Sequence, residues 1–359
     1  MAEKNKYHVI GLMSGTSLDG IDVVEVVFYK DENQKWKFQL LNSELFEFEE
    51  NILRSLKETY VLPAEKLIKL SADLGRYYGK IVNNFITKYK IDKSELDFVV
   101  SHGQTVFHQP QNGFTLQIGN GPELSVTTGL SSVTDFRTKD VALGGNGAPF
   151  IPVADFLLFS NMAESFLNLG GFSNYSFKQQ EVVKSYDVCP VNIVVNHLVQ
   201  SAGISYDKDG EIGKKGTVNH QLLESLNSLA FYQDESPKSL GWEWVVKEIL
   251  PLLTAESVLE NKIRTFYEHS AIQIGKVVND ISPKSVLITG GGVKNTFLMS
   301  RIKAHVKCEI VIPNEEVIDF KEAIGFAFLG LLRWRNEVNV WKSVTGAKKD
   351  SSSGVVYHS

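Results

Sequence analysis

One succession of elements, a strand, a glycine turn and two further strands, occurs twice in this chain. In the first copy the expected strands are residues 7–10, 23–29 and 35–46, with the glycine turn at 11–22. In the second copy they are 166–169, 172–177 and 182–186, with the turn at Gly170-Gly171. Such a repeat predicts two similar α/β domains. A length of 359 residues agrees, because single hydrophobic cores rarely grow that large.

We therefore expect an N-terminal domain over residues 1–140, a C-terminal domain over 141–340 and a tail over 341–359 that packs back on the first domain. The net charge of −5 gives no reason to expect nucleic acid as a partner. The two cysteines are far apart and offer no disulfide framework or CxxC pair. No apolar run is long enough to span a membrane, so we expect a cytoplasmic protein without a membrane partner. A homodimer is one oligomeric state that the sequence leaves open.

The first glycine turn carries the polar groups that a phosphate needs. Gly15 and Gly20 permit tight backbone geometry, so the turn can present amide N–H groups and hydroxyls to a phosphate. Asp19 and Asp22 add carboxylates, which near a polyphosphate address Mg²⁺ directly or through water. The alternative is an ordinary glycine hairpin with polar decoration. The candidate nucleotide contacts are Gly15, Thr16, Ser17, Leu18, Asp19, Gly20, Ile21 and Asp22.

Further candidate ligand contacts follow the next elements of the N-terminal half. Residues 63–89 show helical spacing of apolar residues, and the strand expected at 96–101 ends in His102-Gly103-Gln104-Thr105. Polar groups at the end of a buried strand are the usual ligand contacts of open α/β sheets. Gln104 and Thr105 are therefore candidates, whereas His102 is equally well explained as a histidine that fixes a turn.

The passage 113–152 lacks helical periodicity and is rich in glycine, which favours a functional loop. Asp135 and Arg137 lie in it, and Arg137 is suited to a bidentate pair with a substrate carboxylate. The alternative is that Arg137 pairs with Asp135 or Asp140 as a structural contact.

The C-terminal half supplies a candidate general base and a second nucleotide loop. Asp187 ends the strand at 182–186 and precedes a helix expected at 191–199, which suits a base facing a crevice, although a plain acid at a helix start fits too. A strand at 285–289 runs into Gly290-Gly291-Gly292, where backbone can approach a nucleotide closely. Asn295 follows as a sugar or phosphate contact. A helix expected at 320–332 carries Glu322 on its first turn.

Several nucleotide and metal chemistries are excluded by motif. The sequence has no GxxxxGK[ST] loop, no GxGxxG after a strand, and no HExxH or paired CxxC. What remains is phosphoryl transfer without a P-loop. Two meander-based domains with glycine turns suggest the two-domain architecture of actin, Hsp70 and sugar kinases.

Taken together, these blocks resemble the anhydro-N-acetylmuramic acid kinase family over nearly the whole chain. The resemblance rests on residues 11–22, 102–105, 116–119, 135–137, 147–149, 168–171, 187, 290–292 and 343–346. It implies an α/β, two-domain actin-like fold of the ribonuclease H-like type, with an interdomain cleft. It also implies an ATP- and Mg²⁺-dependent kinase of peptidoglycan recycling, which phosphorylates the sugar O6 while water opens the 1,6-anhydro ring.

By matching position, the resemblance makes Gly15 to Asp22 the ATP phosphate loop, Gly290 to Gly292 the nucleoside loop and Asp187 the catalytic base. Gly170, Gly171 and Asn295 join the nucleotide contacts, and the substrate contacts are Gln104, Thr105, Asp135, Arg137 and Glu322. The mechanism predicts domain closure over the sugar.

The chain departs from the family pattern in two places. After Asp187 the family commonly has Thr-Gly-Pro-Gly-Asn, whereas this chain has Val188-Cys189-Pro190-Val191-Asn192, which puts phosphate contact by this turn in doubt. After Gln-Ile-Gly it has Asn120 where Asp is frequent. Two other functions stay open: a related sugar or carboxylate kinase with another substrate, and a non-catalytic actin-like nucleotide-binding protein.

Overall fold

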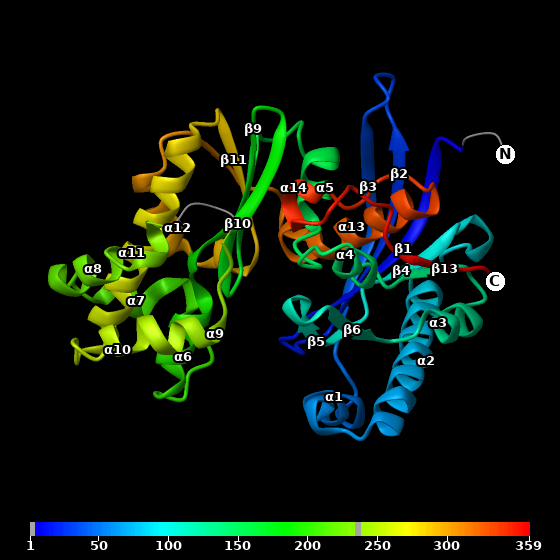
Figure 1. The fold of residues 1–359 in the computed structure, drawn as a ribbon, viewed down its shortest axis with the longest axis horizontal. Helices are drawn as coiled ribbons and strands as arrows, with labels where there is room; N and C mark the ends of the chain where they lie inside the picture. The colour runs from blue at the N-terminus through cyan, green and yellow to red at the C-terminus, as the bar shows by residue number, and fades with distance from the viewer. Residues whose placement is uncertain (1–3, 234–237) are drawn as a thin grey trace. The chain divides into compact units, whose positions relative to one another are not determined.

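The structure is a computed structural model that describes residues 4–233 and 238–359. The chain divides into two compact units (Figure 1). Unit 1 comprises Met1–Phe159 and Phe320–Ser359, and unit 2 comprises Ser160–Asp319.

Unit 1 is built on a six-stranded sheet with the strand order β13-β7-β4-β1-β2-β3. β1 to β3 form an antiparallel meander, β4 runs parallel to β1, and β7 runs parallel to β4. The sheet strands are β1 (Lys6–Ser14), β2 (Ile21–Lys30), β3 (Trp36–Phe46), β4 (Phe98–Ser101), β7 (Ser132–Thr134) and β13 (Val355–Tyr357). A separate hairpin consists of β5 (Gln104–Gln109) and β6 (Phe114–Ile118). The α-helices are α1 (Glu50–Lys57), α2 (Ala64–Tyr89), α3 (Gly121–Thr128), α4 (Thr138–Ala142), α5 (Ile151–Leu158), α14 (Lys342–Thr345) and α13 (Glu315–Trp334), which belongs to this unit from Phe320 onward.

Helices cover both faces of the unit 1 sheet. The apolar face of α2 packs on the side of β1 that carries Ile10 and Leu12. On the other side α13 comes so close to β1 that a Cβ on Gly11 would lie 2.8 Å from the Ala327 Cβ. Gly11 is therefore a packing glycine, and this contact fixes the strand that leads into the first glycine turn.

Unit 2 repeats this plan with a five-stranded sheet in the order β10-β9-β8-β11-β12. Its first three strands again form an antiparallel meander, and β11 runs parallel to β8. The strands are β8 (Ser165–Leu169), β9 (Phe172–Gln179), β10 (Val182–Pro190), β11 (Ser285–Thr289) and β12 (Glu309–Val311). The helices are α6 (Asn192–Gln200), α7 (Glu211–Lys215), α8 (His220–Asn227), α9 (Trp242–Trp244), α10 (Leu250–Leu253), α11 (Leu259–Ile281) and α12 (Thr296–His305). The expected repeat of two α/β domains is confirmed, because the five strands of this sheet have the same order as β3-β2-β1-β4-β7 of unit 1.

The domain boundaries differ from the expected ones. Residues 141–159 and 320–340 belong to unit 1 rather than to the second domain, so the first boundary lies after Phe159. The reason is packing: a Cβ on Gly325 of α13 would lie 2.7 Å from the Ile151 side chain of α5, and Lys321 pairs with Asp155 at 3.0 Å. The tail belongs to unit 1, because β13 pairs with β7.

Two expectations about regular structure were wrong. The passage 113–152 is not mainly loop, since it contains α3 and α4 and the start of α5. Pro122 and Pro152 stand in the first turns of α3 and α5, where a missing N–H costs little. Secondly, α13 begins at Glu315, so Glu322 lies on its third turn instead of its first.

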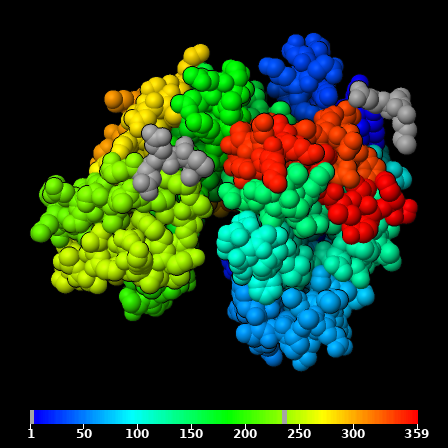
Figure 2. Space-filling view, viewed as in Figure 1, coloured from blue at the N-terminus to red at the C-terminus, as the bar shows by residue number. Residues whose placement is uncertain are grey.

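The β5–β6 hairpin (cyan to teal) lies at the surface of unit 1 beside the blue segment that contains α1 (Figure 2). Phe107 of β5 contacts Tyr60, which follows α1, at a ring centroid distance of 5.8 Å. Among the residues that the structure describes, no helix combines the length and apolar character needed to cross a membrane.

Candidate active site

In unit 1, the first glycine turn joins β1 to β2. The Leu18 N–H donates to the Gly15 carbonyl at 3.2 Å, and Thr16, Ser17 and Asp19 are exposed. Gly20 is required, because a Cβ there would lie 2.9 Å from the Phe46 carbonyl oxygen. A Cβ on Gly15 would come no closer than 3.4 Å to another residue, Ser17, so steric crowding does not explain why a glycine occupies this position. The turn therefore exposes its hydroxyls and one carboxylate to whatever binds over it.

Gln104 connects the start of β5 with the first glycine turn. Its side-chain N–H donates to the Gly15 carbonyl at 3.0 Å. The side chain is buried, and its Oε1 has no hydrogen-bond partner among the residues that the structure describes. Gln117 of β6 shows the same feature: its N–H donates to Thr115 at 2.9 Å, and its buried Oε1 likewise has no partner within residues 4–233 and 238–359. A buried acceptor without a donor is costly, and a ligand N–H or O–H would relieve that cost.

Arg137 is held by a histidine rather than by an acid. Its Nε–H donates to His102 Nε2 at 3.0 Å, and within the described part of the chain it forms no ion pair with Asp135 or Asp140. The Asp140 carboxylate instead accepts hydrogen bonds from Gly147 and Thr345. The expected alternative of an Arg137–aspartate pair is thus not what the structure contains. Desolvation lowers the pKa of Arg137 to about 10, and the Glu322 carboxylate opposes this shift, so the guanidinium is charged at neutral pH.

The remaining unit 1 candidates have different surroundings. Asp135 has a positive φ of 57° and accepts a hydrogen bond from the Thr138 N–H, which starts α4. Thr105 is half-buried opposite Gln117 in the hairpin. Glu322 is exposed on α13, and its charge is felt by Arg137. Gln104 and the Gly15 turn are thus in direct contact, whereas Asp135 serves a local turn.

In unit 2, two of the glycine turns lie side by side because β8 and β11 are neighbouring parallel strands. A Cβ on Gly290 would lie 2.8 Å from the Leu169 carbonyl oxygen, and a Cβ on Gly292 would lie 3.0 Å from the same atom. Gly170 and Gly171 continue from this strand, and their carbonyls accept N–H groups from the start of α6. The predicted contacts Gly170, Gly171 and Gly290–Gly292 are therefore close together.

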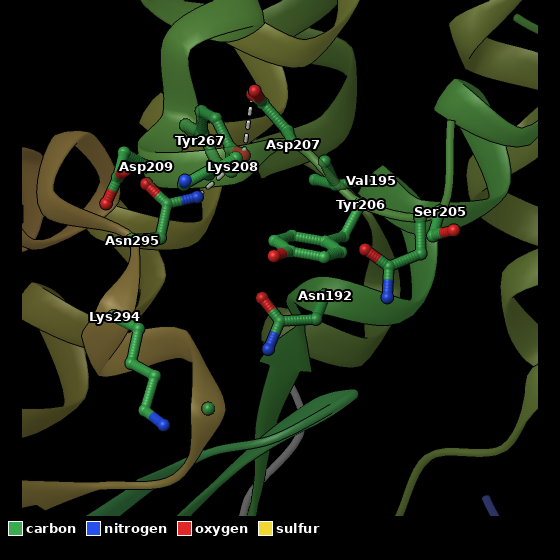
Figure 3. A pocket seen from close by; sticks show the side chains of 12 residues that line it. Asn192, Val195, Ser205, Tyr206, Asp207, Lys208, Asp209, Tyr267, Lys294 and Asn295 are labelled. Carbon is green, nitrogen blue, oxygen red and sulfur yellow. Dashed lines mark hydrogen bonds between the residues drawn. The ribbon is translucent and has the colours of Figure 1, made fainter. Parts of the chain in front are cut away.

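A pocket of about 440 Å³ opens next to these turns within unit 2 (Figure 3). Asn192 and Gly291 line it, and Tyr206 points into it in Figure 3. Asn295 lines it too and caps α12, because its Oδ1 accepts from the Leu298 N–H at 2.9 Å. The full lining is Asn192, Val195, Asn196, Ser205, Tyr206, Asp207, Lys208, Asp209, Tyr267, Gly291, Lys294 and Asn295. This volume is within the range of small-molecule sites.

One hydrogen-bonded chain fixes the wall of this pocket. The Asn295 side-chain N–H donates to the Tyr267 hydroxyl at 2.8 Å, and that hydroxyl donates to Asp207 at 3.0 Å. Asp207 also accepts the N–H groups of Ile212 and Gly213. The sequence did not predict a role for Tyr206, Asp207 or Tyr267. The only available signal was Asp207 near Gly210, a pattern typical of turns.

Asp187 lies inside β10, where a β-bulge follows it, and the strand continues to Pro190. The expectation that Asp187 ends the strand was therefore wrong. Its Oδ1 accepts from the Asn174 side chain at 3.1 Å, and its Oδ2 accepts from the Ser239 hydroxyl at 3.1 Å and the Leu240 N–H at 2.9 Å. The residue is half-buried and does not line the 440 Å³ pocket. Within the described residues, these three bonds occupy three of the roughly four acceptor positions of a carboxylate, so Oδ1 keeps one lone pair for a further proton donor.

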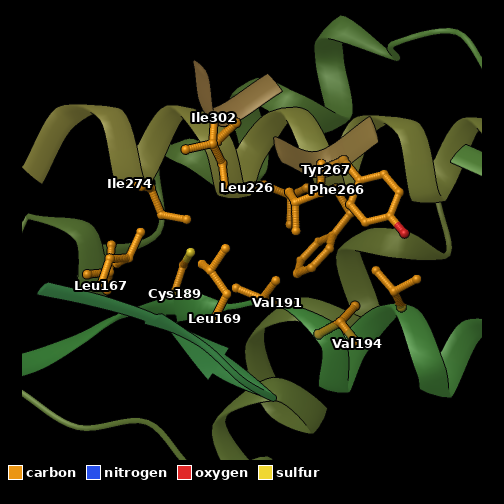
Figure 4. Close-up of a cluster of buried hydrophobic side chains, with 14 of the residues drawn as sticks. Leu167, Leu169, Cys189, Val191, Val194, Leu226, Phe266, Tyr267, Ile274 and Ile302 are labelled. Carbon is orange, nitrogen blue, oxygen red and sulfur yellow. The ribbon is translucent and has the colours of Figure 1, made fainter. Parts of the chain in front are cut away.

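The segment after Asp187, which departs from the family pattern, is part of the unit 2 core. Cys189 and Val191 are buried with Leu169 beneath α11 (Figure 4). The backbone N–H groups of Val191 and Ile193 donate to the Gly171 carbonyl. These donors are already used, which agrees with the expectation that this turn is a doubtful phosphate contact.

The glycine turn at 290–292 offers a test of the local geometry. Gly290 has a φ of 88°, and a Cβ there would lie 2.6 Å from Asn168 Oδ1, whereas a Cβ on Gly291 would meet no described residue within 4 Å. We expect Gly290→Ala to lower the free energy of unfolding by ~1–3 kcal/mol. Gly291→Ala, the matched control, should change it by less than about 0.5 kcal/mol. Urea unfolding measures both, and equal stability of the two variants would contradict this geometry.

Comparison with known proteins identifies the family. The sequence profile of the family "Anhydro-N-acetylmuramic acid kinase" matches residues 7–359. A relative of that name from Haemophilus influenzae is 34% identical over 386 residues, which cover 99% of each chain. Another of the same name, from Sulfurimonas denitrificans, is 31% identical and covers 97% of this chain and 98% of its own. Among solved structures, (R)-2-hydroxyglutaryl-CoA dehydratase component A from Acidaminococcus fermentans matches 89% of this chain and 96% of its own, with 11% identity and a TM-score of 0.46. The chain therefore belongs to the anhydro-N-acetylmuramic acid kinase family.

Proposed function

We propose that this chain uses ATP to phosphorylate O6 of 1,6-anhydro-N-acetylmuramic acid while water opens the anhydro ring, giving N-acetylmuramic acid 6-phosphate. The family and the full-length relatives support this activity. Within the structure, the side chain of Gln104 gives the best support. Its amide N–H binds the Gly15 carbonyl of the first glycine turn, and its buried Oε1 has no hydrogen-bond partner among the described residues.

Unit 1 would recognise the sugar. The free acceptor on Gln104 suits a hydroxyl or amide N–H of the sugar, and the charged guanidinium of Arg137 suits its lactyl carboxylate. Gln117, with a second partnerless acceptor, joins this set. An N-acetylated sugar acid carries both kinds of group, so the residues match it better than a neutral, unsubstituted sugar.

Unit 2 would hold the nucleoside of ATP in the 440 Å³ pocket beside Gly290–Gly292. The exposed Tyr206 ring offers an aromatic face on which a base can stack. The lining also carries two lysines and two aspartates, and Lys294 pairs with Asp319 at 2.6 Å. Lys208 is therefore the cation that we assign to the phosphates.

Asp187 would act as the general base. Oδ1 has the remaining lone pair, so this oxygen would accept the proton of the water that attacks C1 of the sugar. The bonds from Ser239 and Leu240 to Oδ2 hold the carboxylate in one orientation. As water adds at C1, the anhydro bond to O6 breaks, and O6 becomes the acceptor of the γ-phosphoryl group.

Mg²⁺ would neutralise charge on the phosphates when it is bound. Among the described residues no group of three or more His, Cys, Asp or Glu side chains is arranged to hold a metal ion. Mg²⁺ that is bound mainly by phosphates and water needs only one or two carboxylates, and the exposed Asp19 in the first turn fits that role. Asp22 is the second candidate.

The assay combines the purified chain, ATP, Mg²⁺ and a panel of sugars that includes 1,6-anhydro-N-acetylmuramic acid, with products read by mass. The proposed reaction adds both a phosphate and a water to the sugar. A phosphate without a water, on a sugar whose ring is already open, would indicate a related kinase with another substrate. ATP binding without turnover of any sugar would indicate a non-catalytic nucleotide-binding protein.

Asp19→Ala tests the nucleotide side of the site. If Asp19 addresses Mg²⁺ through water, its removal should weaken Mg-ATP use by ~10–100-fold, as the loss of an outer-shell metal contact does, and should leave the sugar KM nearly unchanged. The matched control is Glu32→Ala, which removes an exposed carboxylate from the turn between β2 and β3. Unchanged Mg-ATP affinity of the Asp19 variant in calorimetry would remove this residue from the site.

A further inference from the structure

His102 contacts the cation that the proposed function assigns to the sugar carboxylate. Its imidazole is buried, with 3% of the residue exposed, and lies directly after β4. Nε2 is 3.0 Å from Arg137 Nε, and Nδ1 is 2.8 Å from the Gly103 carbonyl oxygen. Because an arginine N–H can only donate, Nε2 must be the acceptor. The ring proton therefore belongs on Nδ1, where it is donated to Gly103.

The surroundings fix this ring in place. Gly103 has a φ of 76°, and a Cβ on it would lie 2.8 Å from the Ile118 carbonyl oxygen, so the carbonyl that receives the ring proton depends on a glycine. The other side of the imidazole packs on Phe326 of α13 at a centroid distance of 4.5 Å. Phe326 also contacts Phe136, which directly precedes Arg137. The same aromatic ring therefore supports both partners of the His102–Arg137 contact.

The charge state of His102 suits its role as the acceptor of the Arg137 N–H. Burial, followed by the charge of Arg137, lowers the pKa of His102 to about 3, so the ring is neutral at neutral pH. A neutral imidazole can hold the guanidinium without neutralising its charge. An aspartate at this place would hold it too, but would reduce its attraction for a substrate carboxylate.

We infer that His102 is a positioning residue: its unprotonated Nε2 occupies the Nε–H of Arg137 and leaves the two terminal amino groups of the guanidinium for the lactyl carboxylate of the sugar. This inference rests on the proposed function. Without His102 the guanidinium remains charged but can rotate, so binding of the carboxylate loses its orientation.

Two substitutions of His102 distinguish its hydrogen bond to Arg137, at Nε2, from its hydrogen bond to the Gly103 carbonyl, at Nδ1. His102→Gln places an amide oxygen near the position of Nε2 and should keep the sugar KM within about threefold of wild type. His102→Asn reaches only the position of Nδ1, so it keeps a donor for Gly103 but loses the acceptor. Its sugar KM should rise ~10–100-fold, as expected for a lost hydrogen bond to a charged group, while kcat and the ATP KM change little. Equal KM values for the two variants would overturn the inference.

A double-mutant cycle excludes a purely structural role. In an Arg137→Ala background, His102→Asn should have almost no further effect on the sugar KM. Additive effects of the two substitutions would overturn the inference. A second measurement needs no variant: the ¹⁵N shifts of the His102 ring in the wild-type protein should report the Nδ1–H tautomer, and the Nε2–H tautomer would contradict it. Absence of wild-type turnover with the anhydro sugar would instead reject the proposed function, whereas the tautomer can still be measured.

Discussion

Asp187→Asn should lower kcat by ~10²–10⁴-fold, the usual contribution of a general base. Asparagine has nearly the same shape as aspartate but cannot take a proton from water. Because water attack at C1 and release of O6 are linked in the proposed reaction, the loss should affect ring opening and phosphorylation together. Product mass and ADP release, measured in the same reaction, should fall by the same factor.

The fold should tolerate this substitution. The new amide oxygen can accept the bonds from Ser239 and Leu240, so its NH₂ group would face Asn174. Asn174 can present its own oxygen by an amide flip, because its other partner, the Ser185 hydroxyl, is able both to donate and to accept. Thermal unfolding and ATP affinity should therefore stay close to wild type.

Ser239→Ala is the matched control, since it removes one bond to the Asp187 carboxylate and keeps the carboxylate itself. We expect kcat of this variant to stay within about tenfold of wild type, because the Leu240 N–H and the Asn174 amide still hold the carboxylate, which can still accept a proton. If Asp187→Asn retains more than about a third of wild-type kcat, the base lies elsewhere. Glu322, which is exposed on α13, is then the next candidate.

The strands of both units could be predicted because each follows from the pattern of neighbouring residues in the sequence. Short runs of apolar residues between glycine turns indicate the strands one after another along the chain. Because this pattern occurs twice, it implied two similar units, and their sheets share a strand order. The same reasoning placed the turn at Gly290 directly after a strand, whereas Asp187, expected to end a strand, lies inside β10, which continues to Pro190. It failed between residues 113 and 152, because the helices there, α3 and α4, are too short to show a clear periodicity.

Contacts between distant segments could not be predicted in this way. Arg137 had Asp135 and Asp140 as near neighbours in sequence, and the structure gives it His102 instead, 35 residues away. The pocket wall likewise depends on a bond between Asp207 and Tyr267, which are 60 residues apart. No periodicity or motif signals such pairs, because each side chain also fits an ordinary structural role.

Arg137→Ala should have the largest effect on the sugar side. Loss of one partner from a hydrogen-bonded charge pair costs about 2–5 kcal/mol, so kcat/KM for 1,6-anhydro-N-acetylmuramic acid should fall roughly 30- to 5000-fold. The ATP KM should change little, because the pocket proposed for the nucleoside and Gly290–Gly292 belong to unit 2, whereas Arg137 belongs to unit 1. Steady-state kinetics with each substrate varied in turn measures both.

Two comparisons show why Arg137→Ala loses kcat/KM: one with Arg137→Lys, and one with a second sugar substrate. Lysine keeps the charge but lacks the fork and the Nε–H that His102 accepts, so it should recover only part of the activity. On a 1,6-anhydro sugar that lacks the lactyl carboxylate, wild type and Arg137→Ala should have similar kcat/KM, because the group that Arg137 binds is absent. If Arg137→Ala lowers the melting temperature but does not change kcat/KM for either sugar, Arg137 is a structural residue. In that case the carboxylate must be bound by another cation.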